Sequence, residues 1–338
     1  MRIAAYVFRH LPEVTAEDAR ELDIINLAFG VIRDGLLYYP DDCLDQLNRL
    51  RTANPDIKII LSIGGWGAGG FSIMSRTQDG INRFADSCMT VVDRLALDGL
   101  DFDWEYPTNS SAGIDSDPSD KQNFTALLRT VRQYLDSRYP GEHKMLTIAA
   151  GCGQYYIDSV EIPKIVPYLD YISLMTYDLS GPWTPVLHHT ALYPCECQES
   201  SAKSHVEMFM KAGVPAEKLM IGAAFYSRIW RDVPSGEKHG LGETAGDRES
   251  GSFGPSFTEL VSMRDTDGYT VYRDPVAHAP YIYNEERREF ISYDDEISVA
   301  EKVDFAKKAG LFGVMYWEHS SDKTRVLLGS MFAEKNKH

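Results

Sequence analysis

Three carboxylates alternate with apolar residues in the segment from residue 98 to 105, which reads DGLDFDWE. Side chains two residues apart in a β-strand point to the same face of the sheet. We therefore expect Asp101, Asp103 and Glu105 to share one face, with apolar side chains on the other. Because buried unpaired charge is costly, the acidic face is not an ordinary packed core. The pattern favours a strand inside a barrel whose outer surface is covered by helices.

Closely spaced carboxylates serve either as general acids and bases or as ligands of Mg²⁺ or Ca²⁺. No other group of metal ligands converges with these three in the sequence. We therefore expect acid–base chemistry and neither a metal nor another cofactor. For Glu105 the competing interpretation is a structural ion pair at a strand end, and Asp98, which precedes the strand, is expected to hold a turn.

The elements that must position this face recur as a short apolar run followed by an amphipathic stretch. The clearest helical stripe runs from Phe124 to Leu135, with apolar residues at i, i+3, i+4 and i+7. Alternating strands and helices argue for a parallel sheet, and eight apolar runs argue for a closed (β/α)8 TIM barrel of the α/β class. We expect its strands over residues 3–6, 24–29, 59–62, 100–105, 146–150, 171–177, 220–226 and 311–317.

The interval before the last expected strand is too long for a single helix. Residues 229–290 contain Gly, Pro and Asp turn signals and short strand-like pieces. We expect them to form a small α+β insertion subdomain between barrel strands seven and eight. The catalytic barrel would then comprise residues 1–228 and 291–338, with its last helix over 297–309.

Composition narrows the partners of the chain. Its 338 residues carry a formal net charge of −16, which argues against nucleic acid or an anionic membrane surface as partner. No apolar run approaches the roughly 18 residues that a membrane helix needs, and no signal peptide is visible. With five irregularly spaced cysteines, we expect reduced, inert, buried thiols. This favours a cytoplasmic location, the alternative being secretion with the signal removed.

Five short motifs occur in order and at barrel spacing. Besides the acidic DGLDFDWE, they are SIGGW from Ser62, MTYD from Met175, GAAFYSR from Gly222 and MYWE from Met315. Together they resemble glycoside hydrolase family 18, which includes the chitinases. The resemblance spans roughly residues 3 to 325. It implies a (β/α)8 barrel that cleaves chitin or chitooligosaccharides, the β-1,4-linked polymers and oligomers of N-acetylglucosamine.

The resemblance also implies catalytic roles. Glu105 protonates the leaving glycosidic oxygen and later acts as base, while the C2 acetamido oxygen of the substrate is the nucleophile, so that the reaction retains configuration. Asp103 shares a proton with Glu105 and turns toward the acetamido N–H. Asp101, deepest in the barrel, orders Asp103. Tyr177 holds the acetamido oxygen, and Asp178 hydrogen-bonds near the reacting sugar.

Aromatic side chains bind the flat C–H faces of sugar rings with little loss of rotamer freedom. Trp317 is expected to form the floor of the subsite where the bond is cleaved. The other residues assigned to substrate binding by the resemblance are Met175, Tyr226, Arg228, Trp66, Trp183 and Tyr6, although the segment around Tyr6 departs from the pattern of many family members.

For some residues two interpretations remain open. Trp66, Trp183 and Trp230 suit sugar platforms and apolar packing equally well. His188 and His189 invite a metal interpretation, but their place in a loop favours loop structure or contact with a subsite.

Two other functions remain as alternatives. One is an endo-β-N-acetylglucosaminidase acting on N-glycans, or a glucosaminidase acting on peptidoglycan. The other is a non-catalytic chitin-binding lectin of the same fold; such lectins lose the terminal Glu or its Asp partner, whereas both are present here. In each case the expected partner is a chitooligosaccharide or another glycan that contains N-acetylglucosamine.

Overall fold

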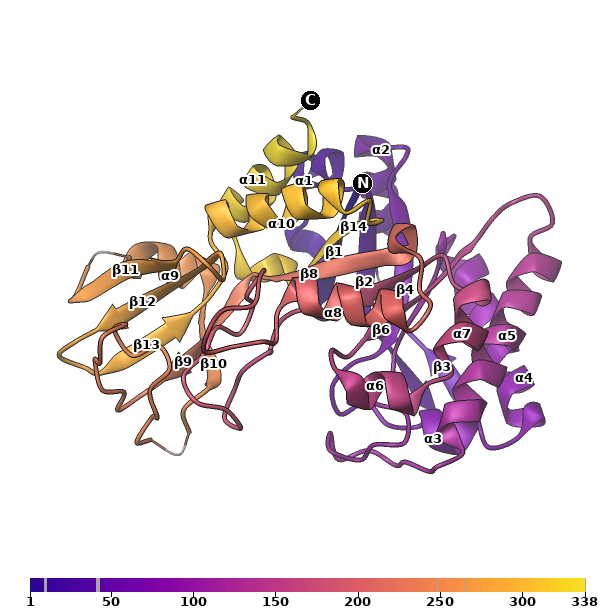
Figure 1. Cartoon of the computed structure of the whole chain (residues 1–338). Coiled ribbons are helices and arrows are strands. Elements are labelled where there is room, and N and C mark those ends of the chain that lie inside the picture. Colours follow the sequence, from indigo (N-terminus) through magenta and orange to yellow (C-terminus); the bar gives the residue numbers. More distant parts are fainter. Residues whose placement is uncertain (9–10, 41–42, 248, 265, 338) are drawn as a thin grey trace. The chain divides into compact units, whose positions relative to one another are not determined.

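The computed structural model of the chain describes residues 1–8, 11–40, 43–247, 249–264 and 266–337. Within these residues, eight parallel strands form a closed barrel in the order β1-β14-β8-β7-β6-β5-β4-β2, which β1 completes by pairing with β2. The predicted (β/α)8 barrel is therefore confirmed. Its strands are β1 (Arg2–Phe8), β2 (Ile24–Arg33), β4 (Lys58–Gly64), β5 (Gly99–Asp103), β6 (Met145–Ala150), β7 (Tyr171–Leu174), β8 (Leu219–Ala224) and β14 (Gly313–Trp317) (Figure 1).

Helices alternate with these strands, as the apolar periodicity predicts. The stripe from Phe124 to Leu135 lies on α5 (Asp120–Arg138), where its apolar residues are buried. A capping box between Thr15 and Asp18 starts α1 (Ala16–Glu21). The other described helices are α2 (Leu44–Ala53), α3 (Phe71–Met74), α4 (Gln78–Leu95), α6 (Gln154–Ser159), α7 (Ile162–Ile165), α8 (Ala202–Lys211), α9 (Phe257–Met263), α10 (Glu296–Lys308) and α11 (Val326–Lys335).

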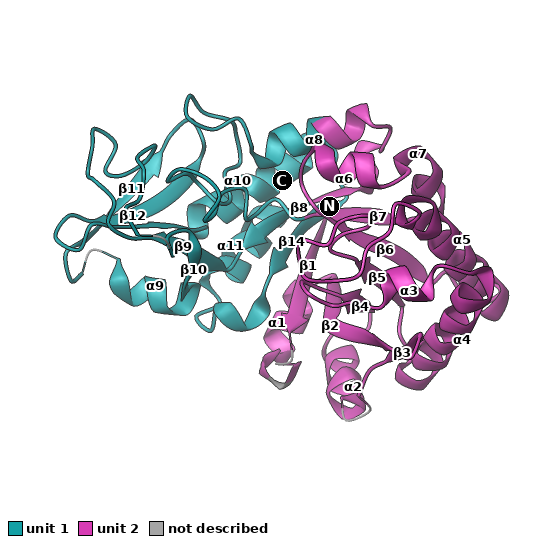
Figure 2. Cartoon of the chain, turned by 90° about the horizontal axis from the view of Figure 1, so that it is seen from below, with its two compact units in different colours: residues 1, 175–207, 221–338 teal, residues 2–174, 208–220 magenta. Residues whose placement is uncertain are grey.

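The chain divides into two compact units, coloured separately in Figure 2. One unit comprises residues 2–174 and 208–220. In it, the register of β4, β5 and β6 places Ser62 and Thr147 on either side of Asp101. Because these three residues lie at the same level of neighbouring strands, hydroxyl groups from both neighbours reach one carboxylate.

The other unit comprises residue 1, residues 175–207 and residues 221–338. Its five-stranded antiparallel sheet, in the order β10-β9-β13-β12-β11, supplies the predicted α+β insertion together with α9. The proposed domain division at residues 229 and 290 stays a prediction, and the first strand of this sheet begins at Tyr226. The strands are β9 (Tyr226–Trp230), β10 (Ser252–Ser256), β11 (Tyr269–Asp274), β12 (Ala279–Asn284) and β13 (Glu289–Ser292).

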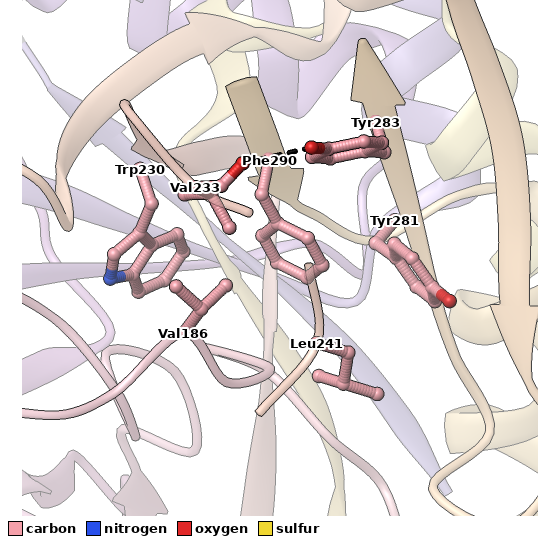
Figure 3. Packing of buried hydrophobic residues seen from close by; sticks show 7 residues of the cluster. All are labelled: Val186, Trp230, Val233, Leu241, Tyr281, Tyr283 and Phe290. Atoms are coloured by element: carbon pink, nitrogen blue, oxygen red, sulfur yellow. Dashed lines mark hydrogen bonds between the residues drawn. The ribbon is translucent and has the colours of Figure 1, made fainter. Parts of the chain in front are cut away.

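Trp230 lies in the core of this insertion. Its side chain is 1% exposed and packs edge-on against Phe290, with ring centroids 5.8 Å apart. Figure 3 shows it beside Val186 and Val233, and Tyr283 donates a hydrogen bond of 2.8 Å to the Val233 carbonyl. Of the two interpretations of Trp230, packing is therefore the one that the structure supports.

Two further expectations concern the burial of the cysteines and helices that could span a membrane. Cys43 and Cys88 are buried, but the expectation of buried thiols is wrong for Cys152, which is partly exposed. It is also wrong for Cys195, which is partly exposed, and Cys197, which is exposed. Their sulfur atoms lie 3.4 Å apart across a turn. None of the helices that the structure describes has both the length and the apolar character that a membrane crossing requires.

Candidate active site

The acidic strand is shorter than its alternating pattern predicts. β5 ends at Asp103, so Glu105 lies two residues beyond it, whereas we expected the strand to continue to Glu105. At the end of β5 the SIGGW segment approaches closely, and Gly65 donates a backbone hydrogen bond of 2.9 Å to the Asp103 carbonyl. Gly64 has φ +117°, and a Cβ there would lie 2.1 Å from the same oxygen. Glycine is therefore required where the two backbones meet.

Asp101 is fully buried and accepts three hydroxyl hydrogen bonds. Tyr6 and Ser62 donate to its Oδ2 at 3.0 and 2.7 Å, and Thr147 donates to its Oδ1 at 2.6 Å. Burial raises the pKa of Asp101, and the three donors oppose that rise without cancelling it. With both oxygens occupied by protein groups, Asp101 is a structural anchor at the base of the acidic face.

Tyr6 therefore serves the barrel interior. Its side chain is 2% exposed, and its hydroxyl group lies on Asp101. The Tyr6 hydroxyl therefore helps to hold Asp101, and the sugar contact that the family resemblance implies for Tyr6 stays a prediction.

Asp103 is also buried but is bonded very differently. Its Oδ1 has no hydrogen-bond partner within the described part of the chain. Burial, followed by the nearby charges of Glu105 and Asp101, raises the pKa of Asp103 well above its usual range. Tyr156, whose buried hydroxyl likewise has no partner among the described residues, has its pKa raised by burial and then by Asp103. Asp103 thus combines a raised pKa with a buried acceptor oxygen that bonds to no group in the described residues.

Glu105 is buried and is followed by a cluster of aromatic rings. The peptide bond between Glu105 and Tyr106 is cis. Tyr106 contacts Tyr155 and Tyr156 edge-on, with centroids 5.5 and 5.9 Å apart. Trp66 lies 6.4 Å from Tyr106 and is 65% exposed, which is the exposure that a sugar platform needs. Four aromatic side chains thus lie together in the segment that follows Glu105 and beside it.

Trp104 stabilises the opposite side of the same segment. It stacks on Phe71 at 5.1 Å and meets Phe124 edge-on at 5.5 Å. Because Trp104 is only 1% exposed, it anchors the chain between Asp103 and Glu105 to the helices outside the barrel. The apolar half of the alternating pattern therefore behaves as the sequence predicts.

A second group of site residues lies in the other unit, around Asp178. This carboxylate accepts hydrogen bonds of 2.7 Å from the Tyr226 hydroxyl and from Arg228 Nε. His189 Nδ1 lies 3.7 Å away. Burial acts to raise the pKa of Asp178, but His189 and Arg228 outweigh it and leave the pKa well below its usual range. Asp178 is thus a fixed negative charge, in contrast to Asp103.

His189 and Arg228 complete this group around Asp178. Burial lowers the pKa of His189, and the imidazole ring packs against Tyr226 with ring centroids 5.2 Å apart. Arg228 also donates from Nη1 to the Gly251 carbonyl at 2.8 Å. His189 therefore meets the expectation of a loop residue that contacts the site. No group of three or more potential metal ligands occurs among the described residues.

Met175 and Tyr177 follow the end of β7 at Leu174, so that the MTYD motif lies on the loop beyond the strand. The Tyr177 hydroxyl lies 3.8 Å from the sulfur of Met315, and its ring packs closely over Gly222, where a Cβ would approach within 2.7 Å.

Trp317 and Trp183 differ in exposure. Trp317, the last residue of β14, is partly exposed, and its carbonyl accepts a hydrogen bond of 2.8 Å from Phe225. Trp183 is 67% exposed. Its exposure favours a platform over packing, the reverse of the finding for Trp230.

Several residues of these groups were not expected from the sequence. The sequence did contain a signal for Ser62 and Thr147 as site residues, because both lie on expected strands and Ser62 is part of the SIGGW motif. Tyr156 and Phe253 had no such signal, since a single aromatic residue on a short helix or a short strand has no pattern that distinguishes a binding site from a core. Phe253 is 68% exposed. The Cζ atom of Arg228 lies over its ring, 4.4 Å from the ring centroid.

Comparison with known proteins decides the family. The model of "Glycosyl hydrolases family 18" matches residues 2–322 of the chain. The chain belongs to glycosyl hydrolase family 18. The match covers both groups of site residues.

Similar proteins of this family bear related names. The family 18 hydrolase described here is 36% identical to Chitinase A1 of Niallia circulans over 313 residues, which is 86% of the chain and 44% of that protein. Endochitinase 1 of Metarhizium robertsii is 32% identical, over 85% of the chain and 69% of that protein. The chain thus spans less than half the length of the first relative and about two thirds of the second.

A solved structure matches the chain from end to end. The family 18 N-acetylglucosaminidase from Paenibacillus barengoltzii is 45% identical, with a TM-score of 0.94, and the match covers 98% of the chain and 99% of that structure. The likeness therefore extends over the barrel and the insertion together.

Proposed function

We propose that this chain hydrolyses β-1,4 bonds between N-acetylglucosamine residues, with the substrate's own acetamido group as nucleophile and with retention of configuration. The observation that carries the proposal is the contrast between the two aspartates of β5. Asp101 has both oxygens occupied, whereas Asp103 keeps a buried Oδ1 with no partner in the described residues. A vacant buried acceptor suits a substrate N–H group.

The first step uses Glu105 as acid. Its carboxyl proton passes to the glycosidic oxygen while the bond from that oxygen to C1 breaks. The acetamido carbonyl oxygen forms a new bond to C1, giving an oxazolinium ion. Asp103 accepts the acetamido N–H and stabilises the positive charge, while Tyr177 holds the acetamido oxygen in line with C1.

The second step returns the protein to its starting state. A water molecule attacks C1, its proton passes to the carboxylate of Glu105, and the bond from C1 to the acetamido oxygen breaks. Two inversions at C1 give net retention. Asp178, fixed by Arg228 and Tyr226, serves as a hydrogen-bonding group for the sugar.

Whether the protein cleaves within an oligosaccharide or releases single units from its end is a separate question, and the relatives favour two different answers. Chitinase names among the relatives favour cleavage within a chain. The structure that matches from end to end is named an N-acetylglucosaminidase, which favours release of single N-acetylglucosamine units. Release of single N-acetylglucosamine units is therefore our second candidate function.

The deciding experiment is product analysis by mass spectrometry. Chitin hexamer, an N-glycopeptide and peptidoglycan fragments are each incubated with the protein. We expect cleavage of the hexamer, with early release of the monomer if the second candidate is correct and of dimers or trimers otherwise. Proton NMR of the first products should show the β-anomer. Cleavage of the glycopeptide or peptidoglycan alone would contradict the proposed substrate.

The matched variants are Glu105→Gln and Glu196→Gln. We expect Glu105→Gln to lower kcat by about 10²- to 10⁴-fold, the usual contribution of general acid catalysis, because Gln cannot supply the proton. Oligosaccharide binding should persist. Glu196, whose side chain is 91% exposed, should be replaceable without loss of activity. Binding without cleavage by the unmodified chain would instead indicate a lectin.

A further inference from the structure

Cys195 and Cys197 bring two thiols together in the long segment that follows β7. Their sulfur atoms lie 3.4 Å apart, within hydrogen-bonding distance of each other. Cys195 is partly exposed and Cys197 is exposed, so small molecules in the solvent reach the pair. Accessible cysteines react with oxidants and disulfides, whereas cysteines buried in apolar surroundings are inert. The two side chains therefore have the placement of a reactive dithiol.

The two cysteines belong to one tight turn, whose first and last residues are Cys195 and Gln198. The backbone N–H of Cys195 donates to the Gln198 carbonyl at 2.8 Å, and the N–H of Gln198 donates to the Cys195 carbonyl at 3.1 Å. These two bonds form an antiparallel bridge that closes the turn. Because the backbone that carries both thiols is closed in this way, the sulfur atoms stay near each other.

The side chain of Gln198 fixes the turn to the interior of its unit. Gln198 is 4% exposed, and His188, which it contacts, is fully buried. The His188 N–H donates to Oε1 of Gln198 at 2.9 Å, while Nε2 donates to the carbonyls of His188 and Ser200 at 2.7 and 2.9 Å. A turn held by three such bonds loses little further freedom when its thiols react with each other.

The two thiols differ in their surroundings. Cys195 packs against a buried cluster of alanines, made up of Ala191, Ala277 and Ala279. Burial, followed by the hydrogen bond with Cys197, raises the pKa of Cys195 to about 11. Because only the thiolate is nucleophilic, Cys195 attacks an external reagent slowly. The exposed Cys197 is therefore the thiol that a reagent meets first, and Cys195 lies beside it as the second thiol.

We propose that Cys195 and Cys197 form a reversible disulfide by exchange with low-molecular-weight disulfides. The thiolate of Cys197 first attacks one sulfur of the reagent; a mixed disulfide forms, and half of the reagent leaves as a thiolate. Cys195 then loses its proton to solvent, and its sulfur attacks the Cys197 sulfur and displaces the other half of the reagent. The two cysteines lose two electrons, which reduce the reagent to two thiols. This reaction goes beyond the proposed hydrolysis and uses none of its residues.

The first test incubates the reduced protein with oxidised glutathione, alkylates the remaining thiols and measures the peptide that contains both cysteines by mass spectrometry. We expect that peptide to lack two hydrogen atoms and to escape alkylation, and dithiothreitol should reverse both effects. The neighbouring thiol has an effective concentration on the order of mM, so with released glutathione in the micromolar range the internal disulfide should exceed the mixed one at least about tenfold. Full alkylation of both cysteines, or a mixed disulfide as the final product, would overturn the proposal.

Single variants test the order of the two steps. Cys195→Ser should stop at a mixed disulfide on Cys197, because the second thiol is missing. Cys197→Ser should react with glutathione at least about tenfold more slowly than Cys195→Ser, since the remaining thiol is partly shielded and stays protonated at neutral pH. Equal rates in the two variants would contradict the order. Cys152→Ser, at another partly exposed cysteine, is the control and should form the internal disulfide as the unmodified chain does.

Gln198→Ala tests the contribution of the turn. Loss of the bonds to His188 and Ser200 should slow the second step at least about threefold, because the two sulfur atoms are no longer held together. Gln154→Ala, at an exposed glutamine on α6, is the control and should leave the rate unchanged. An unaltered rate in Gln198→Ala, with the fold intact by circular dichroism, would show that the turn does not position the thiols. None of these measurements depends on hydrolysis, so they decide the proposal whether or not the chain cleaves chitooligosaccharides.

Discussion

Asp101 and Asp103 lie two residues apart on β5, yet only Asp101 has both carboxylate oxygens bonded by hydroxyl donors of the protein. Asp103 keeps one oxygen without a partner in the described residues. The same strand therefore supports a fixed anchor and a group free to bond substrate. The reason is register, because the strands beside β5 bring their hydroxyls to the level of Asp101.

Asp103→Asn should change the pH dependence of stability. Burial raises the pKa of Asp103 in the folded protein, so the neutral form is the favoured one. Its contribution to stability is fully present below the unfolded pKa of about 3.9 and is lost as pH rises toward the folded value. Asn does not ionise. The free energy of unfolding of the variant, relative to the unmodified protein, should therefore increase between pH 4 and pH 8.

Urea unfolding at pH 4, 6 and 8 measures this difference. Asp115→Asn, at an exposed aspartate of the same unit, is the control and should give a difference that does not depend on pH. A flat difference for Asp103→Asn as well would mean that Asp103 ionises in the folded protein as readily as in the unfolded one. The same variant should lower kcat if Asp103 stabilises the oxazolinium ion.

Tyr6→Phe should separate support of Asp101 from contact with the sugar. Loss of one of three donors to a buried carboxyl group should cost about 1–2 kcal/mol of stability. If Tyr6 acts only through Asp101, kcat should fall while KM stays unchanged. Tyr38→Phe, at an exposed tyrosine, is the control. A rise in KM with unaltered stability would instead support a contact between Tyr6 and the sugar, as the resemblance implies.

Asp178 and Arg228 should show a strong energetic coupling. Either Asp178→Asn or Arg228→Gln leaves the other group without its charged partner, at a cost of about 1–3 kcal/mol. The double variant should cost less than the sum of the two single variants. A double-mutant cycle in urea measures the coupling.

The control cycle uses Lys203 and Glu207, an exposed pair on α8. Pairs of this kind contribute at most about 1 kcal/mol. If the Asp178–Arg228 coupling were as small as that of the control pair, the aspartate would not be held by the arginine in solution. The pH dependence gives a second check: because the folded pKa of Asp178 is lowered, its contribution is present above about pH 3.9 and is lost as pH falls through the folded value.

Two tryptophans, Trp183 and Trp230, show what the sequence alone does not decide. Trp183 and Trp230 offered the same two interpretations, because the residue type alone does not distinguish a sugar platform from apolar packing. The structure exposes Trp183 and buries Trp230 in the core of the insertion. The difference depends on which side chains surround each ring, and those come from distant segments.

The sequence by itself determined the barrel, its insertion and the acidic face, since these depend on periodicity within single segments. The alternation from residue 98 to 105 places Asp101 and Asp103 on one side because the pleat of a strand has a period of two. Only the tertiary structure decided which groups bond to each carboxylate. Tyr6 and Thr147 reach Asp101 from 95 and 46 residues away, and Arg228 reaches Asp178 from 50 residues away. Such contacts follow from the pairing and packing of distant segments, which no local pattern records.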